Sequence, residues 1–175
     1  MKKCLIVVDY QNDFVTGSLG FEKAKELELG IANRINAYHL AGNDVIYTLD
    51  THYDDYSDSY EGRHLPIPHC IEGTDGHKLY GSVAGCVKDI DIVFKKSVFG
   101  SDAMYEYLKT ACYSSVEFVG VVTNICVMAN AVLLKTTQPE AEIIIDAKCV
   151  ASNDKRLNEE ALDVLEGMQF TVRNR

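Results

Sequence analysis

Short runs rich in β-branched and aromatic residues alternate with segments of helical period, and this alternation restricts the fold of the chain more than any other feature. It is typical of repeated βα units, in which helices cover a parallel sheet. The predicted strands are residues 3–8, 44–49, 90–94, 116–121, 142–146 and 170–173. The predicted helices are residues 22–41, 102–111, 124–135 and 158–168. We therefore expect an α/β fold, with a three-layer α/β/α structure around a six-stranded, mainly parallel sheet.

The length and composition of the chain are those of one globular domain. Its 175 residues, 47% apolar and 25% charged, suffice for a core without disulfide or metal staples, so residues 1–175 are predicted to form a single domain. The net charge of −9 opposes binding to nucleic acid and to anionic lipid. No stretch approaches the roughly 20 apolar residues of a membrane span.

The N-terminus and the cysteines indicate a cytoplasmic protein. The apolar run at residues 4–8 is too short for the apolar region of a signal peptide. The six cysteines are scattered without paired spacing, which argues against a disulfide framework. A reducing compartment, the cytoplasm, is therefore expected.

One long segment, residues 50–88, departs from the alternation of strands and helices. It is rich in Tyr, Asp, His and Gly, and it holds four of the five histidines of the chain. Long irregular connections in compact domains are usually functional or disordered. Because this segment concentrates imidazoles and contains two prolines just before His69, we interpret it as an ordered part of a site.

Reactive side chains follow four of the predicted strands. Asp9 follows the first strand, Asp50 and His52 the second, and Lys96 the third, while Cys126 comes shortly after the fourth. In an open parallel sheet, ligands bind beyond the carboxyl ends of the strands. We therefore expect a carboxylate, an ammonium, a thiol and a candidate metal site at the same edge.

The predicted surroundings of Cys126 favour a nucleophilic thiol. Thr123 is the predicted N-cap of the helix at 124–135, which places Cys126 near unpaired backbone N–H groups that can hold an oxyanion. The helix N-terminus and Lys96 are expected to favour the thiolate. Asp9 would take the thiol proton and return it to a leaving amine. Such a triad suits acyl transfer to water.

A second cluster has the composition of a metal site. Asp50 and His52 flank one residue directly after a strand, and His69 follows two prolines on a stiffened loop. Two histidines and one carboxylate leave positions open for water and substrate on a divalent metal. Zn²⁺ is the expected ion, with Fe²⁺ and Mn²⁺ as alternatives.

Three stretches of the sequence resemble the signature regions of the isochorismatase-like cysteine hydrolases. They are Asp9-Tyr10-Gln11-Asn12-Asp13-Phe14, Lys96-Ser97-Val98-Phe99-Gly100-Ser101 and Gly120-Val121-Val122-Thr123-Asn124-Ile125-Cys126-Val127. The resemblance implies a six-stranded parallel sheet and a triad of Asp9, Lys96 and Cys126. It also implies a non-proline cis peptide between Val121 and Val122, and an oxyanion hole formed by the amides of Val122 and Cys126.

Within this superfamily, the metal cluster resembles that of the nicotinamidases, whose metal binds the pyridine nitrogen of the substrate. Asp-x-His, Pro-x-His-Cys and Gly-Thr-x-Gly are typical of them, and all three patterns occur at residues 50–76. Glu61 is a further candidate ligand, directly or through water. His64 competes for a place in the site, because the loop length does not fix which side chain turns inward.

Two departures from the nicotinamidase pattern affect the substrate pocket. The chain has no tryptophan, so stacking on a substrate ring falls to Phe14, Phe99 or a tyrosine within residues 53–60. The string Phe99-Gly100-Ser101-Asp102 also replaces the commoner aromatic-Ser-Ala-Phe sequence.

These observations predict a metal-assisted amidohydrolase that converts nicotinamide and water to nicotinate and ammonia. An alternative is hydrolysis of another small amide, carbamoyl or ureido compound. Isochorismate hydrolysis is disfavoured, because enzymes of that activity lack the nucleophilic cysteine. A non-catalytic, flavodoxin-like binding module is also disfavoured, since residues 9–14 contain no glycine to cradle a phosphate. The expected partner is a small-molecule amide, and the resemblance implies a homo-oligomer.

Overall fold

Six parallel strands form one sheet in the order β3-β2-β1-β4-β5-β6 in the computed structural model, which describes residues 2–175. The strands are β1 (Lys3–Val8), β2 (Asp44–Asp50), β3 (Ile92–Lys96), β4 (Ser115–Val121), β5 (Glu142–Ala151) and β6 (Thr171–Arg173). The predicted α/β fold with a six-stranded sheet is confirmed, and each adjacent pair is parallel. The strand order reverses between β1 and β4, and this is where open α/β sheets bind ligands.

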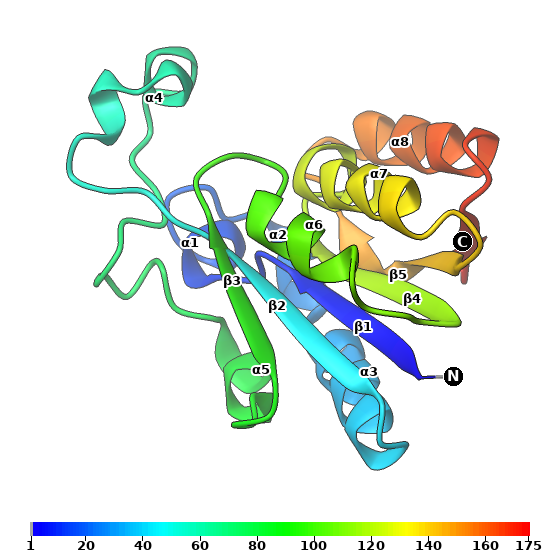
Figure 1. Cartoon of the computed structure of the whole chain (residues 1–175). Coiled ribbons are helices and arrows are strands. Elements are labelled where there is room, and N and C mark those ends of the chain that lie inside the picture. The colour runs from blue at the N-terminus through cyan, green and yellow to red at the C-terminus, as the bar shows by residue number, and fades with distance from the viewer. Residues whose placement is uncertain (1) are drawn as a thin grey trace.

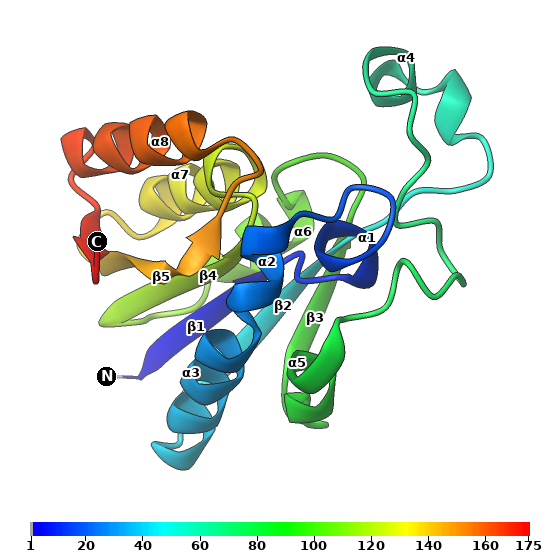
Figure 2. The same ribbon diagram turned by 180° about the vertical axis from the view of Figure 1, so that it is seen from behind.

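Helices cover both faces of the sheet (Figures 1 and 2). Helices α2, α3 and α5 lie on one face, and α6, α7 and α8 lie on the other. The α-helices are α1 (Asn12–Val15), α2 (Glu22–Glu26), α3 (Glu28–Leu40), α4 (Tyr60–His64), α5 (Gly81–Cys86), α6 (Asp102–Leu108), α7 (Met128–Thr137) and α8 (Lys155–Gly167). Within residues 2–175, no helix combines the length and the apolar character needed to cross a bilayer.

The central strand β1 shows why the sequence of a buried strand is apolar at consecutive positions. Cys4, Ile6 and Val8 belong to the core beneath α6, α7 and α8, whereas Leu5 and Val7 belong to the core against α3. Because successive side chains of a strand point to opposite faces, a sheet covered on both faces needs apolar residues at each position.

Several element boundaries differ from the sequence-based prediction: β5, for example, continues to Ala151, and α6 already ends at Leu108. β3 begins and ends two residues later than expected, so that Lys96 is the last residue of the strand. The helix predicted at 22–41 is interrupted at Leu27, between α2 and α3. α8 begins earlier than predicted because Asp154 caps it, with its Oδ1 accepting a hydrogen bond from Leu157 N at 3.1 Å.

Gly120 allows β4 to approach β1 closely at the edge that carries the reactive residues. Its φ is +114°, and a Cβ atom there would lie 2.1 Å from the carbonyl oxygen of Val8. A side chain is therefore excluded at this position. The close approach brings the ends of β1 and β4 together.

The segment after β2 leaves the sheet and returns through α5. It forms a projecting arm (residues 53–66) that contains the short 3-10 helix η1 (Tyr56–Asp58) and α4, and that stands off beyond the carboxyl ends of the strands (Figure 1). Ser59 caps α4 by accepting a hydrogen bond from Gly62 N at 2.9 Å. The Tyr56 hydroxyl donates to the Leu65 carbonyl at 2.8 Å, which ties the two turns of the arm together.

Candidate active site

Four of the reactive residues predicted at the strand ends lie together at the carboxyl edge of the sheet. Asp9 follows β1, Asp50 ends β2 and Lys96 ends β3, while Cys126 lies in the turn after β4. All four side chains are buried. The parallel register places Asp50 directly opposite Lys96.

Lys96 joins the other three groups. Its Nζ lies 2.7 Å from Asp9 Oδ2 and 3.0 Å from Asp50 Oδ1. The same atom lies 3.6 Å from Cys126 Sγ. Burial alone would lower the pKa of Lys96, but the charges of Asp9 and Asp50 outweigh burial and raise it. Lys96 is therefore a protonated ammonium at neutral pH.

Asp9 is held by Thr48, its neighbour on β2. Asp9 N donates to Thr48 O at 3.1 Å, and the Thr48 hydroxyl donates to Asp9 Oδ1 at 2.7 Å. Burial raises the pKa of Asp9 despite the opposing charge of Lys96. Asp9 Oδ2 lies 2.7 Å from Lys96 Nζ, and since a carboxylate oxygen has two lone pairs, one of them remains for a proton.

Cys126 lies in a π-helical turn, η2 (Thr123–Val127), from which α7 continues. The sequence-based expectation of a favoured thiolate is wrong for the free protein. Burial and the negative charge of Asp9 raise the pKa of the thiol, and Lys96 opposes this only in part. Cys126, 6% exposed, therefore keeps its proton until a base removes it.

Thr123 does not cap the helix that bears Cys126, contrary to the prediction. Val122 occupies the N-cap position and offers no side-chain hydrogen bond. The Thr123 hydroxyl instead donates to Asn158 Oδ1 on α8 at 2.7 Å. The hydroxyl that was predicted to cap the helix is therefore bound by Asn158 of α8. The peptide between Val121 and Val122 is cis, as the resemblance implied.

Asp50, His52 and His69 converge as predicted for a metal site. Asp50 Oδ2 lies 3.2 Å from His52 Nε2 and 3.3 Å from His69 Nε2, and one donor atom from each residue lies within 4.8 Å of the others. His69 Nδ1 donates to the Ile67 carbonyl at 2.9 Å, which leaves the Nε2 lone pair for a ligand. Burial works against ionised Asp50, but the two histidines and Lys96 hold its pKa well below the ordinary value. The donor set fits a divalent metal.

Of the two further candidates for this cluster, Glu61 is the one that faces it. Glu61 Oε1 lies 3.7 Å from His69 Nε2. Burial and the charge of Asp50 raise the pKa of Glu61. His64 is exposed, and its Nδ1 donates to the Tyr60 carbonyl at 2.8 Å.

A cavity of about 250 Å³ connects the two clusters. Its walls include Cys126, Val122, Asp50 and His69, and it is completed by Phe14, Leu19, Phe21, Glu61, Leu65, Phe99, Ile125 and Asn153. Phe14 and Phe99 thus both face it, as predicted, and the Phe14 ring lies 5.5 Å from the His69 ring. We refer to this cavity as the inner chamber.

Comparison with known proteins places this geometry in a family. The Isochorismatase domain model matches residues 3–174. The chain belongs to the isochorismatase family. It is 32% identical over 145 residues to the isochorismatase family protein PncA of Bacillus subtilis, covering 75% of this chain and 78% of that protein. The nicotinamidase/pyrazinamidase of Mycobacterium tuberculosis is 28% identical over 155 residues, covering 74% and 76%.

Structural comparison gives the same assignment. The crystal structure of the nicotinamidase/pyrazinamidase PncA from Bacillus subtilis superposes with a TM-score of 0.87, at 28% identity, over 98% of this chain and 99% of that one. This isochorismatase family member therefore shares its fold with nicotinamidases across almost the whole chain.

Three polar side chains, of which Gln11 and Asn130 are buried, support the site, and the sequence analysis missed their roles. The Gln11 amide donates to the carbonyls of Asp50 and His77 at 2.9 and 2.7 Å, and it accepts from Asp50 N at 2.8 Å. Asp13 accepts from the amide of Cys70, beside His69, at 2.7 Å. These two residues hold the backbone of the metal cluster in place.

Asn130 supports the nucleophile. Its Nδ2 donates to the carbonyls of Cys126 and Phe99 at 2.8 and 3.0 Å, and its Oδ1 accepts from Ser101 N at 2.9 Å. Asn130 is fully buried. It thereby fastens the turn that bears Cys126 to the loop after Lys96. The one sequence signal for this role was a polar residue on the core-facing side of an apolar helix.

Proposed function

We propose that this isochorismatase family member is a metal-assisted amidohydrolase that uses Asp9, Lys96 and Cys126 to convert nicotinamide and water to nicotinate and ammonia. The observation that carries the proposal is the position of Lys96. Its ammonium contacts the candidate base, the candidate nucleophile and Asp50 of the metal cluster. One buried edge therefore combines acyl-transfer groups with a candidate metal site.

Cys126 Sγ would attack the amide carbonyl carbon while Asp9 takes the thiol proton. Val122 and Cys126 line the same chamber, and their amides are the proposed donors to the carbonyl oxygen as it becomes an oxyanion. Asp9 then gives its proton to the departing nitrogen, the C–N bond breaks, and ammonia leaves a thioester on Sγ. The raised pKa of buried Asp9 suits a group that must both accept and return a proton.

Water completes the cycle. Asp9 takes a proton from the attacking water, the thioester C–S bond breaks, and the proton returns to Sγ. The products are the carboxylic acid and the regenerated thiol. Throughout, the Lys96 ammonium offsets negative charge on Asp9 and on the sulfur.

Asp50, His52 and His69 would hold the metal, with Glu61 as a further ligand directly or through water. When bound, a metal such as Zn²⁺, or alternatively Fe²⁺ or Mn²⁺, supplies a Lewis acid that takes the lone pair of a substrate ring nitrogen. The inner chamber is smaller than the roughly 300–1,000 Å³ of common ligand pockets, which favours a small amide. Phe14 and Phe99 would contact the faces of the ring.

The nucleophile is tested by measuring ammonia release from nicotinamide. We expect Cys126→Ala to abolish turnover in a protein that still folds. Cys112→Ala is the matched control, because Cys112 is an exposed cysteine outside the site. Full turnover by Cys126→Ala would end the proposed mechanism.

The substrate is tested by comparing nicotinamide with benzamide, which keeps the scissile bond but lacks the ring nitrogen. We expect kcat/KM for benzamide to be lower by more than the roughly 10–200-fold effect of one methylene in a pocket. Equal rates would reject nicotinamide and favour another small amide, carbamoyl or ureido compound. Cys126 would remain the proposed nucleophile in that case.

A further inference from the structure

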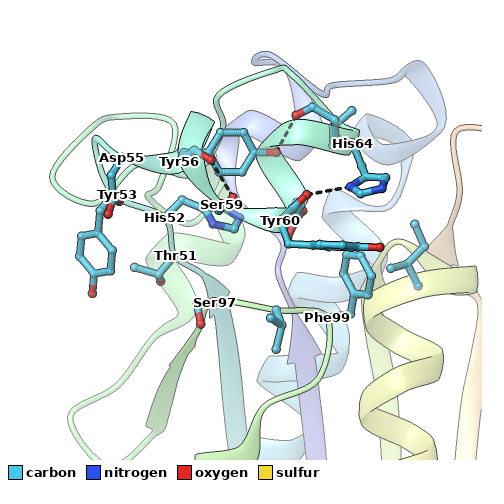
Figure 3. Close-up of a pocket in the computed structure, with 14 residues that line it drawn as sticks. Thr51, His52, Tyr53, Asp55, Tyr56, Ser59, Tyr60, His64, Ser97 and Phe99 are labelled. Carbon is cyan, nitrogen blue, oxygen red and sulfur yellow. Dashed lines mark hydrogen bonds between the residues drawn. The ribbon is translucent and has the colours of Figure 1, made fainter.

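A second, larger cavity adjoins the inner chamber (Figure 3). Its volume is about 670 Å³, and it lies between the arm and the loop after β3. The two cavities share four lining residues, Glu61, Leu65, Phe99 and Ile125, so they lie directly next to each other. Cys126 lines the inner chamber and does not line the larger cavity. We call the larger cavity the vestibule.

The vestibule has apolar walls that are open to solvent. Tyr60 from the arm lies next to Phe99 from the loop after β3, and Tyr53, Tyr56 and Val98 also line the vestibule. Tyr60 is 74% exposed and Phe99 is 48% exposed. A contiguous exposed patch of this kind marks a binding site more often than scattered apolar residues do.

The charge of the lining restricts the occupant. The side chains of Asp55, Glu61, His52 and His64 line the vestibule, and of these Glu61 and His52 also belong to the candidate metal site. Among residues 2–175, no lysine or arginine lines it. The net charge of the whole chain is −9. Without a lysine or arginine to pair with, an anionic group would lose water against these walls for no gain, whereas an uncharged apolar group would replace water favourably.

Contacts within the arm give the vestibule its shape before anything binds. Ser59 caps α4, and the Tyr56 hydroxyl donates to the Leu65 carbonyl. A Cβ atom at Gly62 would lie 2.0 Å from the Tyr56 carbonyl oxygen, so the two turns of the arm pack without a gap. The rings of Tyr60 and His64 lie 4.3 Å apart. A preformed wall lowers the entropy cost of binding.

We infer that the enzyme accepts aromatic carboxamides that carry an uncharged alkyl or aryl substituent on the ring, with the carboxamide in the inner chamber and the substituent in the vestibule. The inference rests on the proposed function. An unsubstituted ring with its carboxamide suits the chamber of about 250 Å³ and leaves the vestibule of about 670 Å³ to solvent. Because Phe99 and Ile125 line both cavities, a substituent passing from one cavity to the other stays in apolar contact.

The test uses nicotinamides that carry hydrogen, methyl, n-butyl or carboxypropyl at either of the two ring carbons farthest from the carboxamide. At one of these positions, kcat/KM should rise from hydrogen to methyl to n-butyl, by up to about fourfold for each added methylene. The carboxypropyl compound should fall at least about tenfold below n-butyl, because its carboxylate would lose water against apolar walls with no lysine or arginine to pair with. A fall along the alkyl series at both positions would overturn the inference while leaving nicotinamide hydrolysis intact.

Variants locate the substituent. Tyr60→Ala should lower the ratio of kcat/KM for n-butyl over methyl, because Tyr60 lines the vestibule and not the inner chamber. Leu40→Ala, on the exposed end of α3, is the matched control and should leave the ratio unchanged. An unchanged ratio in Tyr60→Ala would place the substituent elsewhere and overturn the inference.

Binding separates this inference from the proposed function. Calorimetry on Cys126→Ala should show Kd falling from hydrogen to methyl to n-butyl, whether or not the wild-type enzyme turns the compounds over. A flat series would reject the vestibule as a substituent site. Sedimentation of the wild type and of Tyr60→Asp tests the competing occupant, a second copy of this chain. A Tyr60-dependent dimer together with a flat binding series would assign the surface to that copy.

Discussion

At the scale of single residues, the protonation of the site depends on the balance between burial and Lys96. Cys126 and Asp9 both hold protons more tightly than in water, because burial raises both pKa values. Lys96 opposes that shift for each of them. Burial therefore opposes a thiolate at Cys126, and in the proposed mechanism proton transfer to Asp9 accompanies attack on the substrate.

Thr48 offers a direct test of Asp9 as the base. The Thr48 hydroxyl donates to Asp9 Oδ1 and so lowers the pKa of this carboxyl. Thr48→Val removes the donor, and the pKa of Asp9 should rise further. Since a base acts only when it is deprotonated, activity is lost as pH falls through this pKa. The acidic limb of the kcat/KM profile should move to higher pH by about one unit.

The control for Thr48→Val is Thr136→Val, which makes the same change on the exposed side of α7. Its acidic limb should coincide with that of the wild type. An acidic limb that stays in place or moves to lower pH in Thr48→Val would mean that another group accepts the proton. The proposed role of Asp9 would then fail, whatever the effect on kcat.

Residues at strand ends were predictable, and the residues that support them were not. Asp9, Asp50 and Lys96 could be placed at one edge because parallel strands share a direction, which needs only the order of βα units. Thr48 and Gln11 act through contacts that depend on which strands are neighbours and in which register. That information is tertiary, and neither residue type nor spacing reveals it.

At the scale of elements, the prediction of a helix cap failed where a side chain forms a hydrogen bond with a residue distant in sequence instead of with the neighbouring backbone. Thr123 carries the residue type of an N-cap, but Asn158 of α8 binds its hydroxyl. The same turn is π-helical, and no residue pattern within 123–127 indicates that geometry. β3 was predicted two residues early because its edge position leaves alternate residues partly exposed, which weakens the apolar signal.

Asn130 couples two elements, and its loss should affect both stability and turnover. Asn130→Ala removes the side-chain partner of the Cys126 carbonyl and of the Ser101 N–H, at a cost of about 1–3 kcal/mol in the free energy of unfolding for a buried group that is left unpaired. The Cys126 turn also loses its tie to the loop after Lys96, so kcat should fall more than KM changes. Urea unfolding and steady-state kinetics below the transition measure the two effects.

Asn36→Ala is the matched change at an exposed site on α3, and it should alter neither quantity. A large loss of stability in Asn130→Ala with unchanged kcat would make Asn130 a purely structural residue. An unchanged free energy of unfolding in Asn130→Ala would mean that water forms the hydrogen bonds that the Asn130 side chain now forms.

At the scale of the whole molecule, the metal cluster joins the arm region to the sheet. Asp50 and His52 belong to the end of β2, whereas His69 comes from the returning segment beyond the arm. Hydrogen bonds hold this segment as well, from His52 N to the Cys70 carbonyl at 3.0 Å and from Gln11 to the His77 carbonyl. A bound ion would add a cross-link at the point where the chain turns back toward the sheet.

This arrangement predicts that metal stabilises the folded protein in a way that depends on His52 and not on His64. At a free Zn²⁺ concentration of 100 times Kd, the stabilisation is about 2.7 kcal/mol, which for a domain of this size corresponds to roughly 5–11 °C in Tm. Scanning calorimetry of chelator-treated protein with and without added Zn²⁺ should show this rise in the wild type. His64→Ala should retain the rise, because His64 is exposed and bonded to Tyr60. His52→Ala should lose most of it, since Asp50 and His69 alone leave the ion with two protein ligands from this set. A Zn²⁺-dependent rise of equal size in His52→Ala would show that the ion binds elsewhere, and the metal cluster would then have no part in the reaction.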